Sequence, residues 1–177
     1  MTTNNASFET LAKLCKDGYL TEGDQRGSLL QYMPDCPSRI GYEFWLSLCN
    51  GNKIPKEKDL RPEAIPPICF EHIGFFEVID GGADFMAKIF GEKVSDWQVL
   101  KTKELVSTMS ERVQVSSILT RFRDVVEHRF AALDVYEFVH VQGFKRHLLG
   151  LVCPLANEAG EVTKLFAVGS PFELGKD

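Results

Sequence analysis

Four histidines and five cysteines are the side chains of this sequence best suited to binding a metal or a cofactor. Cys69, Glu71 and His72 lie close together, but a closed metal site needs about four ligands and no second cluster supports them. His128 ends a long helical pattern, and a histidine presented by a helix toward a cavity can ligate haem iron. At about 100° per residue it falls on the polar side of that helix, so we expect a solvated histidine.

Acid–base chemistry has two further candidate pairs. Glu77 and Glu137 both lie in predicted strands, where a carboxylate at the sheet surface is the commoner role. His140 and His147 flank one predicted hairpin and can approach each other across it, with titration near neutral pH as a consequence. Two ordinary sheet histidines are the expected outcome, so neither pair predicts an active site.

The cysteines favour a reducing compartment. Their number is odd, no C-x-x-C pair occurs, and the pattern predicts free, buried thiols rather than disulfides or a zinc ribbon. The positions are Cys15, Cys36, Cys49, Cys69 and Cys153.

Composition fits one globular domain of ordinary size. The chain has 177 residues, of which 44% are hydrophobic and 25% are charged. Its net charge of -5 disfavours a nucleic-acid partner, because such proteins usually gain affinity by neutralising phosphates. No apolar run approaches the ~20 residues of a membrane span, and the first residues lack the pattern of a signal peptide. We therefore expect a cytoplasmic protein with no membrane partner.

The first 36 residues are predicted to form a helical arm. Ser7 can cap a short helix that carries Phe8, Leu11 and Leu14 on one side. The next helix is predicted to start at Pro37 and to end at Gly51. Asp59 can cap a third, short helix.

The apolar period then changes to that of strands. Residues 74–79 and 85–90 flank the turn-forming residues 80–84 and predict a hairpin, and residues 136–141, 146–155 and 162–169 predict an antiparallel meander. Between these groups, a helix is predicted over Ser110–Glu127, with Arg121, Asp124 and His128 on its polar side. Its apolar stripe comprises Val115, Ile118, Leu119, Phe122, Val125 and Val126.

The order predicts an α+β domain with one antiparallel sheet. The strand over 146–155 is apolar on both faces, so both faces of the sheet must be covered. The long helix can cover one face. The arm and the Phe44-Trp45 helix are expected to cover the other, on their own subunit or across a homodimer.

Several short motifs resemble, in their order and spacing, a PAS-like family of small bacterial stand-alone proteins. The resemblance covers about residues 37–172 and leaves 173–177 as a tail. It rests on Phe44-Trp45, residues 51–55 (GNKIP), Asp59, Pro62, residues 74–78 (GFFEV) and residues 84–91 (DFMAKIFG). The resemblance implies a five-stranded antiparallel sheet that cups a small cavity against the long helix, and it favours a homodimer.

The resemblance also implies a non-catalytic sensory, ligand-binding or protein-interaction module that acts in bacterial signalling through a protein partner. No cysteine has the Asn-Cys-Arg context of flavin-binding light sensors, so we expect no coloured cofactor. A small apolar ligand is expected near Phe90, Ile118, Phe122, Val139, Leu149 and Phe166. Two alternatives remain: a small cone-shaped α+β enzyme of isomerase or hydrolase type, and a structural protein whose own side chains fill the cavity.

Overall fold

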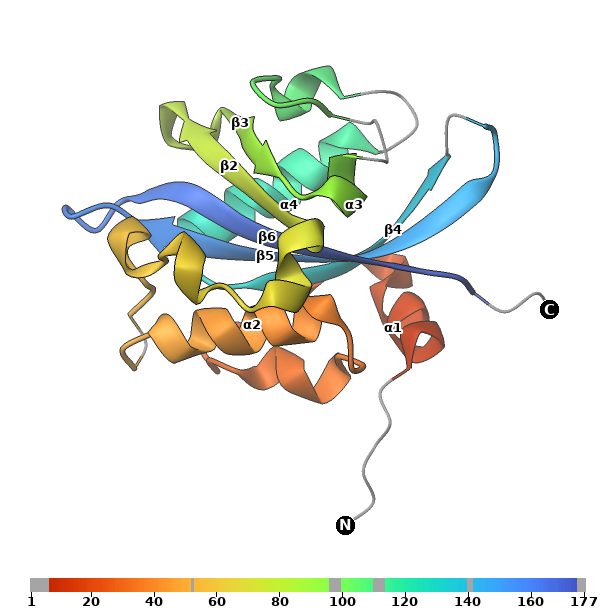
Figure 1. Ribbon diagram of the computed structural model, residues 1–177, viewed down its shortest axis with the longest axis horizontal. Coiled ribbons are helices and arrows are strands. Elements are labelled where there is room, and N and C mark those ends of the chain that lie inside the picture. The colour runs from red at the N-terminus through yellow and green to blue at the C-terminus, as the bar shows by residue number, and fades with distance from the viewer. Residues whose placement is uncertain (1–6, 52, 96–99, 110–113, 140–141, 175–177) are drawn as a thin grey trace, which may run out of the picture.

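The computed structural model describes residues 7–51, 53–95, 100–109, 114–139 and 142–174. Over these ranges the chain forms one antiparallel sheet with helices on both faces (Figure 1). The helices are α1 (Phe8–Leu14), α2 (Pro37–Leu48), α3 (Glu92–Ser95) and α4 (Val115–His128). The strands are β1 (Leu20–Thr21), β2 (Ile73–Ile79), β3 (Asp84–Phe90), β4 (Ala132–Val139), β5 (Lys145–Ala156) and β6 (Val162–Phe172).

The strand order is β1-β4-β5-β6-β2-β3, and every neighbouring pair is antiparallel. The hairpin β2–β3 therefore joins the meander β4–β5–β6 where β2 pairs with β6. These two are the first and last of the long strands along the chain. This is an α+β, PAS-like fold, as predicted, with two strands, an intervening long helix and a three-stranded meander. The sixth strand, β1, was not predicted. It comes from the arm and pairs through Leu20 and Thr21 with the outer side of β4.

The long helix covers one face of the sheet, as expected, although its start differs from the prediction. Gln114, just before α4, has a non-helical backbone (φ -82°, ψ 87°), so the helix begins at Val115 rather than at Ser110. Residues 110–113, where the start was predicted, lie outside the described ranges. The buried residues of α4 are Ile118, Arg121, Phe122 and Val125.

Helix α2 and the arm cover the opposite face, and they do so within the same chain (Figure 1). Trp45 and Tyr42 are fully buried, and the Trp45 indole N–H donates to the Pro154 carbonyl at 3.0 Å. Gly41 allows the close approach, because a Cβ built on it would lie 2.5 Å from Val168 Cγ2 on β6. Leu11 of α1 is also fully buried, whereas Leu14 is 45% exposed and takes little part in covering the sheet.

A buried carboxylate holds the arm in place. Glu22, directly after β1, is 3% exposed and accepts hydrogen bonds from the Arg26 guanidinium, the Tyr42 hydroxyl and the Ala131 amide. These donors come from the arm, from α2 and from the start of the meander. Burial of a carboxylate is tolerated because each oxygen is paired with donors. The arm is thus an integral layer of the fold.

The connector after α2 folds as turns. Asp59 was expected to cap an α-helix, but residues 57–72 form three 3₁₀ segments, Glu57–Asp59, Pro62–Ala64 and Pro67–His72. Proline at or near the start of the last two segments supplies a fixed φ but removes the donor that would extend an α-helix.

Candidate ligand-binding site

A cavity of about 120 Å³ lies between α4 and the sheet. Its wall is mostly apolar, and residues of β2, β3, α4, β4, β5 and β6 all contribute to it. Among the described residues, four phenylalanines line it: Phe76, Phe90, Phe122 and Phe138. The cavity is similar in size to engineered apolar cavities of about 150 Å³ that bind benzene. It is therefore large enough for a small aromatic or aliphatic molecule.

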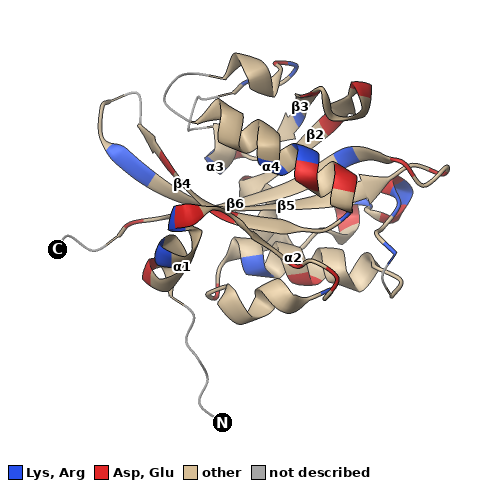
Figure 2. Cartoon of the chain, turned by 180° about the vertical axis from the view of Figure 1, so that it is seen from behind, with Lys and Arg blue, Asp and Glu red and all other residues tan. Residues whose placement is uncertain are grey.

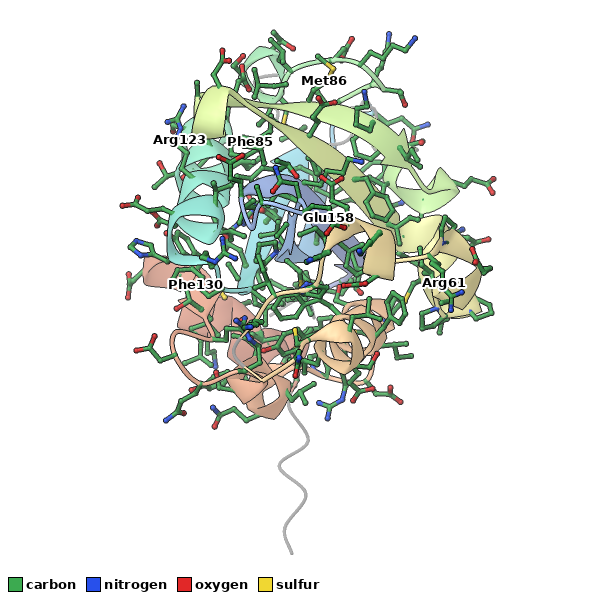
Figure 3. All side chains as sticks on the ribbon, turned by 90° about the vertical axis from the view of Figure 1, so that its left-hand side faces the viewer. Arg61, Phe85, Met86, Arg123, Phe130 and Glu158 are labelled. Atoms are coloured by element: carbon green, nitrogen blue, oxygen red, sulfur yellow. The ribbon has the colours of Figure 1, made fainter. Side chains whose placement is uncertain are left out.

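Aromatic edges fix the shape of the wall. The Phe122 ring meets Phe76 and Phe85 edge-on, with centroids 5.0 and 5.2 Å apart. Figure 3 shows Phe85 on the α4 side of β3, with Met86 on the outer side of the same strand. Edge-to-face pairs hold rings at preferred angles and leave less freedom for the wall to collapse into the void.

Contacts at the end of the β2–β3 hairpin hold α4 over the sheet. Arg123 donates to the carbonyls of Gly82 and Ala83, at 2.9 Å in both cases (Figure 3). The Asp84 carboxylate accepts from the Ser107 amide at 3.2 Å and from the Phe85 amide at 2.8 Å. Partial desolvation acts to raise the pKa of Asp84, but the hydrogen bonds from Ser107 and Phe85 hold that pKa below its usual value of 3.8.

Three side chains on the wall are polar in the described part of the chain: His72, Arg121 and Tyr136. The His72 Nδ1 atom lies 2.9 Å from the Gly169 carbonyl, and it must be the donor because a carbonyl only accepts. The Tyr136 ring packs over Gly150, where an added Cβ would lie 2.4 Å from Tyr136 Cε2. A glycine in the middle of β5 thus provides the space that this ring occupies.

Arg121 was predicted on the polar side of the long helix, and that prediction was wrong. It is 2% exposed, and its Nη1 donates to Asp134 Oδ2 on β4 at 2.8 Å. Burial lowers the pKa of Arg121 to about 10 and raises that of Asp134, while each charge opposes the shift of the other. Arg121 remains a cation at neutral pH.

Three of the six predicted ligand-binding residues line the cavity: Phe90, Ile118 and Phe122. The other three do not. Val139 is 36% exposed, and Leu149 and Phe166 are fully buried outside the cavity wall. Phe166 packs edge-on against Phe44 of α2, on the opposite face of the sheet.

These three residues miss the cavity because side chains alternate between the two faces of a strand. A position that is wrong by one residue therefore lies on the opposite face. The residues on the cavity wall are the direct neighbours Phe138, Leu148 and Ala167.

Apart from His72, the other metal-site and haem candidates from the sequence do not line the cavity. His128 is exposed and stacks on Phe130 with centroids 5.4 Å apart. Its ring and the carboxylates of Asp124 and Glu127 lie within 4.8 Å of one another, an exposed grouping of a kind that is common without an ion. Cys69 is buried and points its Sγ toward the Pro37 carbonyl at 3.6 Å, while Glu71 is exposed.

The two carboxylates considered as an acid–base pair lie apart on the sheet, in line with the expected surface role. Glu77 on β2 pairs with Lys88 at 3.0 Å, and Glu137 on β4 pairs with Lys145 at 2.9 Å, so the two carboxylates lie on strands separated by β5 and β6. His147 lies 3.4 Å from Glu137, and His140 is outside the described residues.

The cysteines are free, as predicted. Four are buried and Cys49 is half-buried. Desolvation raises the pKa of the Cys15, Cys49 and Cys69 thiols to about 11, so these sulfurs remain protonated and weakly nucleophilic at neutral pH.

Charge is dispersed over the surface. Figure 2 shows basic and acidic residues interspersed along the elements rather than gathered into one basic stripe. Among the helices described, none combines the length and the apolar character needed to cross a membrane.

No protein-family model and no curated protein matches the chain. Several solved structures have a similar arrangement. The light state of the Aureochrome1 LOV domain, a blue-light photoreceptor, gives a TM-score of 0.43 at 9% identity over 58% of this chain and 82% of the other.

A VqmA dimer of Vibrio cholerae, in the absence of its target DNA, gives 0.41 at 14% identity over 56% of this chain and 46% of the other. This chain therefore spans less than half of the VqmA chain. A sensory box histidine kinase/response regulator of Burkholderia thailandensis gives 0.36 at 15% identity over 56% and 76%. The assignment of the fold rests on the strand order described above.

Proposed function

We propose that this chain is a non-catalytic sensory module that binds a small, mainly apolar molecule between α4 and the sheet and signals through a protein partner. The observation that carries the proposal is the mainly apolar cavity of about 120 Å³ between α4 and the sheet. Packed interiors contain few voids larger than a water molecule, so a mainly apolar cavity of this size is space that a small molecule can occupy.

The polar groups on the wall favour binding over chemistry. A general base or nucleophile needs a partner that activates it. Asp134 instead accepts from Arg121 and from the Val135 amide, both at 2.8 Å, and the His72 Nδ1–H is used by the Gly169 carbonyl. This supports a sensor rather than the cone-shaped enzyme, in which a carboxylate would orient a histidine or tyrosine.

Signalling would then follow from how the ligand positions α4 and the arm. Asp134 on β4 binds Arg121, which is part of the cavity wall. Strand β1 of the arm pairs with the same strand β4. The partner, the membership of the bacterial PAS-like family, the cytoplasmic location, homodimer formation and the lack of a cofactor all remain predictions.

Benzene is a suitable probe because its size suits the cavity. We expect saturating benzene to raise the melting temperature of the protein, since a ligand that binds only the folded state stabilises it. Ile118→Trp, which fills the cavity from α4, should abolish that rise while circular dichroism shows a retained fold. Ile68→Trp is the matched control, because Ile68 is 52% exposed.

An equal rise in the native protein and in Ile118→Trp, or no rise in either, would contradict a binding cavity at this place. Native mass spectrometry of gently purified protein would show whether the cavity carries a resident molecule. Mass equal to the sequence mass, together with no benzene effect, would favour a structural protein.

A further inference from the structure

The Arg121 side chain combines burial, charge and an unused donor at the cavity wall. It is 2% exposed, and its guanidinium carbon lies 4.2 Å from the centroid of the Tyr136 ring. One terminal nitrogen is bound to Asp134, but the Nε–H is buried without a hydrogen-bond partner among the described residues. The same side chain is part of the cavity wall.

A buried, unpaired N–H on a charged group is costly, and such groups are rare in folded proteins. The cost disappears if a bound molecule supplies an acceptor. The tyrosine ring cannot serve as a full replacement, because an aromatic face accepts more weakly than oxygen or nitrogen. Because Arg121 is part of the cavity wall, an acceptor on a bound molecule would pair with this donor.

Charge balance restricts what that polar end can be. Asp134 already neutralises Arg121 through a buried pair at 2.8 Å. An anionic ligand would add a net negative charge to a mainly apolar space, and isolated buried charge is strongly disfavoured. A neutral acceptor, such as a carbonyl oxygen or an unprotonated ring nitrogen, satisfies the donor without that penalty.

We propose that the cavity selects a small, neutral, mainly aromatic molecule with one hydrogen-bond acceptor, which the Arg121 Nε–H binds. This inference rests on the proposed function and specifies its ligand class. Phe76, Phe90 and Phe122 supply apolar walls for the ring of that molecule.

Benzene and pyridine form a matched pair of probes that differ in one ring atom. At a pH where pyridine is unprotonated, both are neutral and nearly equal in size, but pyridine carries an acceptor. We expect pyridine to bind about tenfold or more tightly than benzene in the native protein, the ratio that one hydrogen bond to a charged group can supply. Benzoate tests the charge argument and should bind more weakly than pyridine.

The Arg121 Nε–H resonance in a ¹⁵N-resolved NMR spectrum reports the bond directly. It should shift when pyridine is added and shift little when benzene is added. Arg121→Lys keeps a cation opposite Asp134 but has no Nε–H, so its pyridine-to-benzene ratio should fall to about one. Because the lysine variant can lose stability, Arg121→Met combined with Asp134→Asn is a second test that leaves no unpaired buried charge.

The outcomes separate the two proposals. If neither probe binds, the cavity is not a binding site and the proposed function fails. If both bind equally in the native protein and in the variants, the cavity binds ligands but Arg121 does not select them. If benzoate binds most tightly, the site takes anions and the neutral class is wrong.

Discussion

The two faces of the sheet are packed in different ways. On the α2 face, Trp45 and Tyr42 are fully buried, and the paired carboxylate of Glu22 fastens the arm. On the α4 face, a cavity remains beneath the helix, and contacts at the end of the β2–β3 hairpin involve the half-buried Asp84 and the exposed Arg123. The α2 layer is filled by large buried side chains, whereas the α4 layer leaves a cavity beneath the helix.

The largest effect is expected from removing the arm. Deleting residues 1–35 removes Glu22 together with the apolar residues Leu11, Leu29 and Met33. Each of these three apolar side chains is at most 1% exposed. The α2 face would then expose apolar surface, which promotes association. Light scattering should show aggregation or a larger assembly than the full-length chain forms. A truncated chain with the same solubility and mass as its parent would mean that the arm contributes little to either face.

Aromatic truncation on each face gives the next largest effect. Trp45→Ala should lower the free energy of unfolding by about 3–5 kcal/mol, because it empties a filled volume and leaves the Pro154 carbonyl without its donor. Phe122→Ala should cost nearer ~3 kcal/mol, because ring atoms that face a void have fewer contacts to lose.

Urea titration of both variants measures the difference, with Ile68→Ala as the exposed control, for which the loss should be below about 0.5 kcal/mol. A loss below ~1 kcal/mol for Phe122→Ala would show that α4 does not pack on the sheet as described.

Two glycines allow the same substitution on opposite faces. Gly41→Ala would bring its Cβ to 2.5 Å from Val168 Cγ2 in a filled layer and should cost about 1–3 kcal/mol. Gly150→Ala would bring its Cβ to 2.4 Å from Tyr136 Cε2, but that ring borders the cavity and can turn into it. We therefore expect a loss of about 1 kcal/mol or less, together with weaker benzene binding. If Gly150→Ala is the more destabilising of the two, the cavity does not relieve the clash.

The smallest effect concerns pH. Asp84 has a lowered pKa in the folded chain, so its contribution to stability is present above its ordinary pKa of 3.8 and is lost as the pH falls through the folded value. Asp84→Ala should cost about 1 kcal/mol at pH 7, and the gap from the native protein should be smaller at a pH below the ordinary pKa of Asp84. Urea titrations at the two pH values test this. A gap that widens in acid would mean that Asp84 is destabilising in its ionised form.

The sequence alone predicted the order of the five long strands and of the long helix between them, because hydrophobic period and turn residues are local signals. It also predicted that both faces of the 146–155 strand would be covered, and residues Leu149 to Ala156 are indeed mostly buried. The face of the sheet on which each strand residue lies was harder to predict. Val139, Leu149 and Phe166 were each one residue from a cavity-lining position. Nothing local distinguishes the two faces when both are apolar.

Arg121 shows a second limit. It lies three residues after Ile118 and four before Val125, on the buried stripe of α4, which was a usable signal. Charged residues are nevertheless expected outside unless paired, and the partner Asp134 lies on a strand whose position depends on the whole sheet. The polar group most relevant to ligand selection could therefore be located only with the tertiary structure.

The short strand β1 also determines how the sheet ends. On the opposite side, backbone bonds between Ala87 and the segment around Lys103 and Glu104, at 2.7 and 3.0 Å, protect the edge of β3. At the β4 edge, β1 offers two paired residues, Leu20 and Thr21. An open edge is a template on which another chain can add a strand. An arm that moved away would uncover an apolar face and a strand edge in one step. Its attachment therefore limits both association through the apolar face and addition of a strand from another chain at the β4 edge.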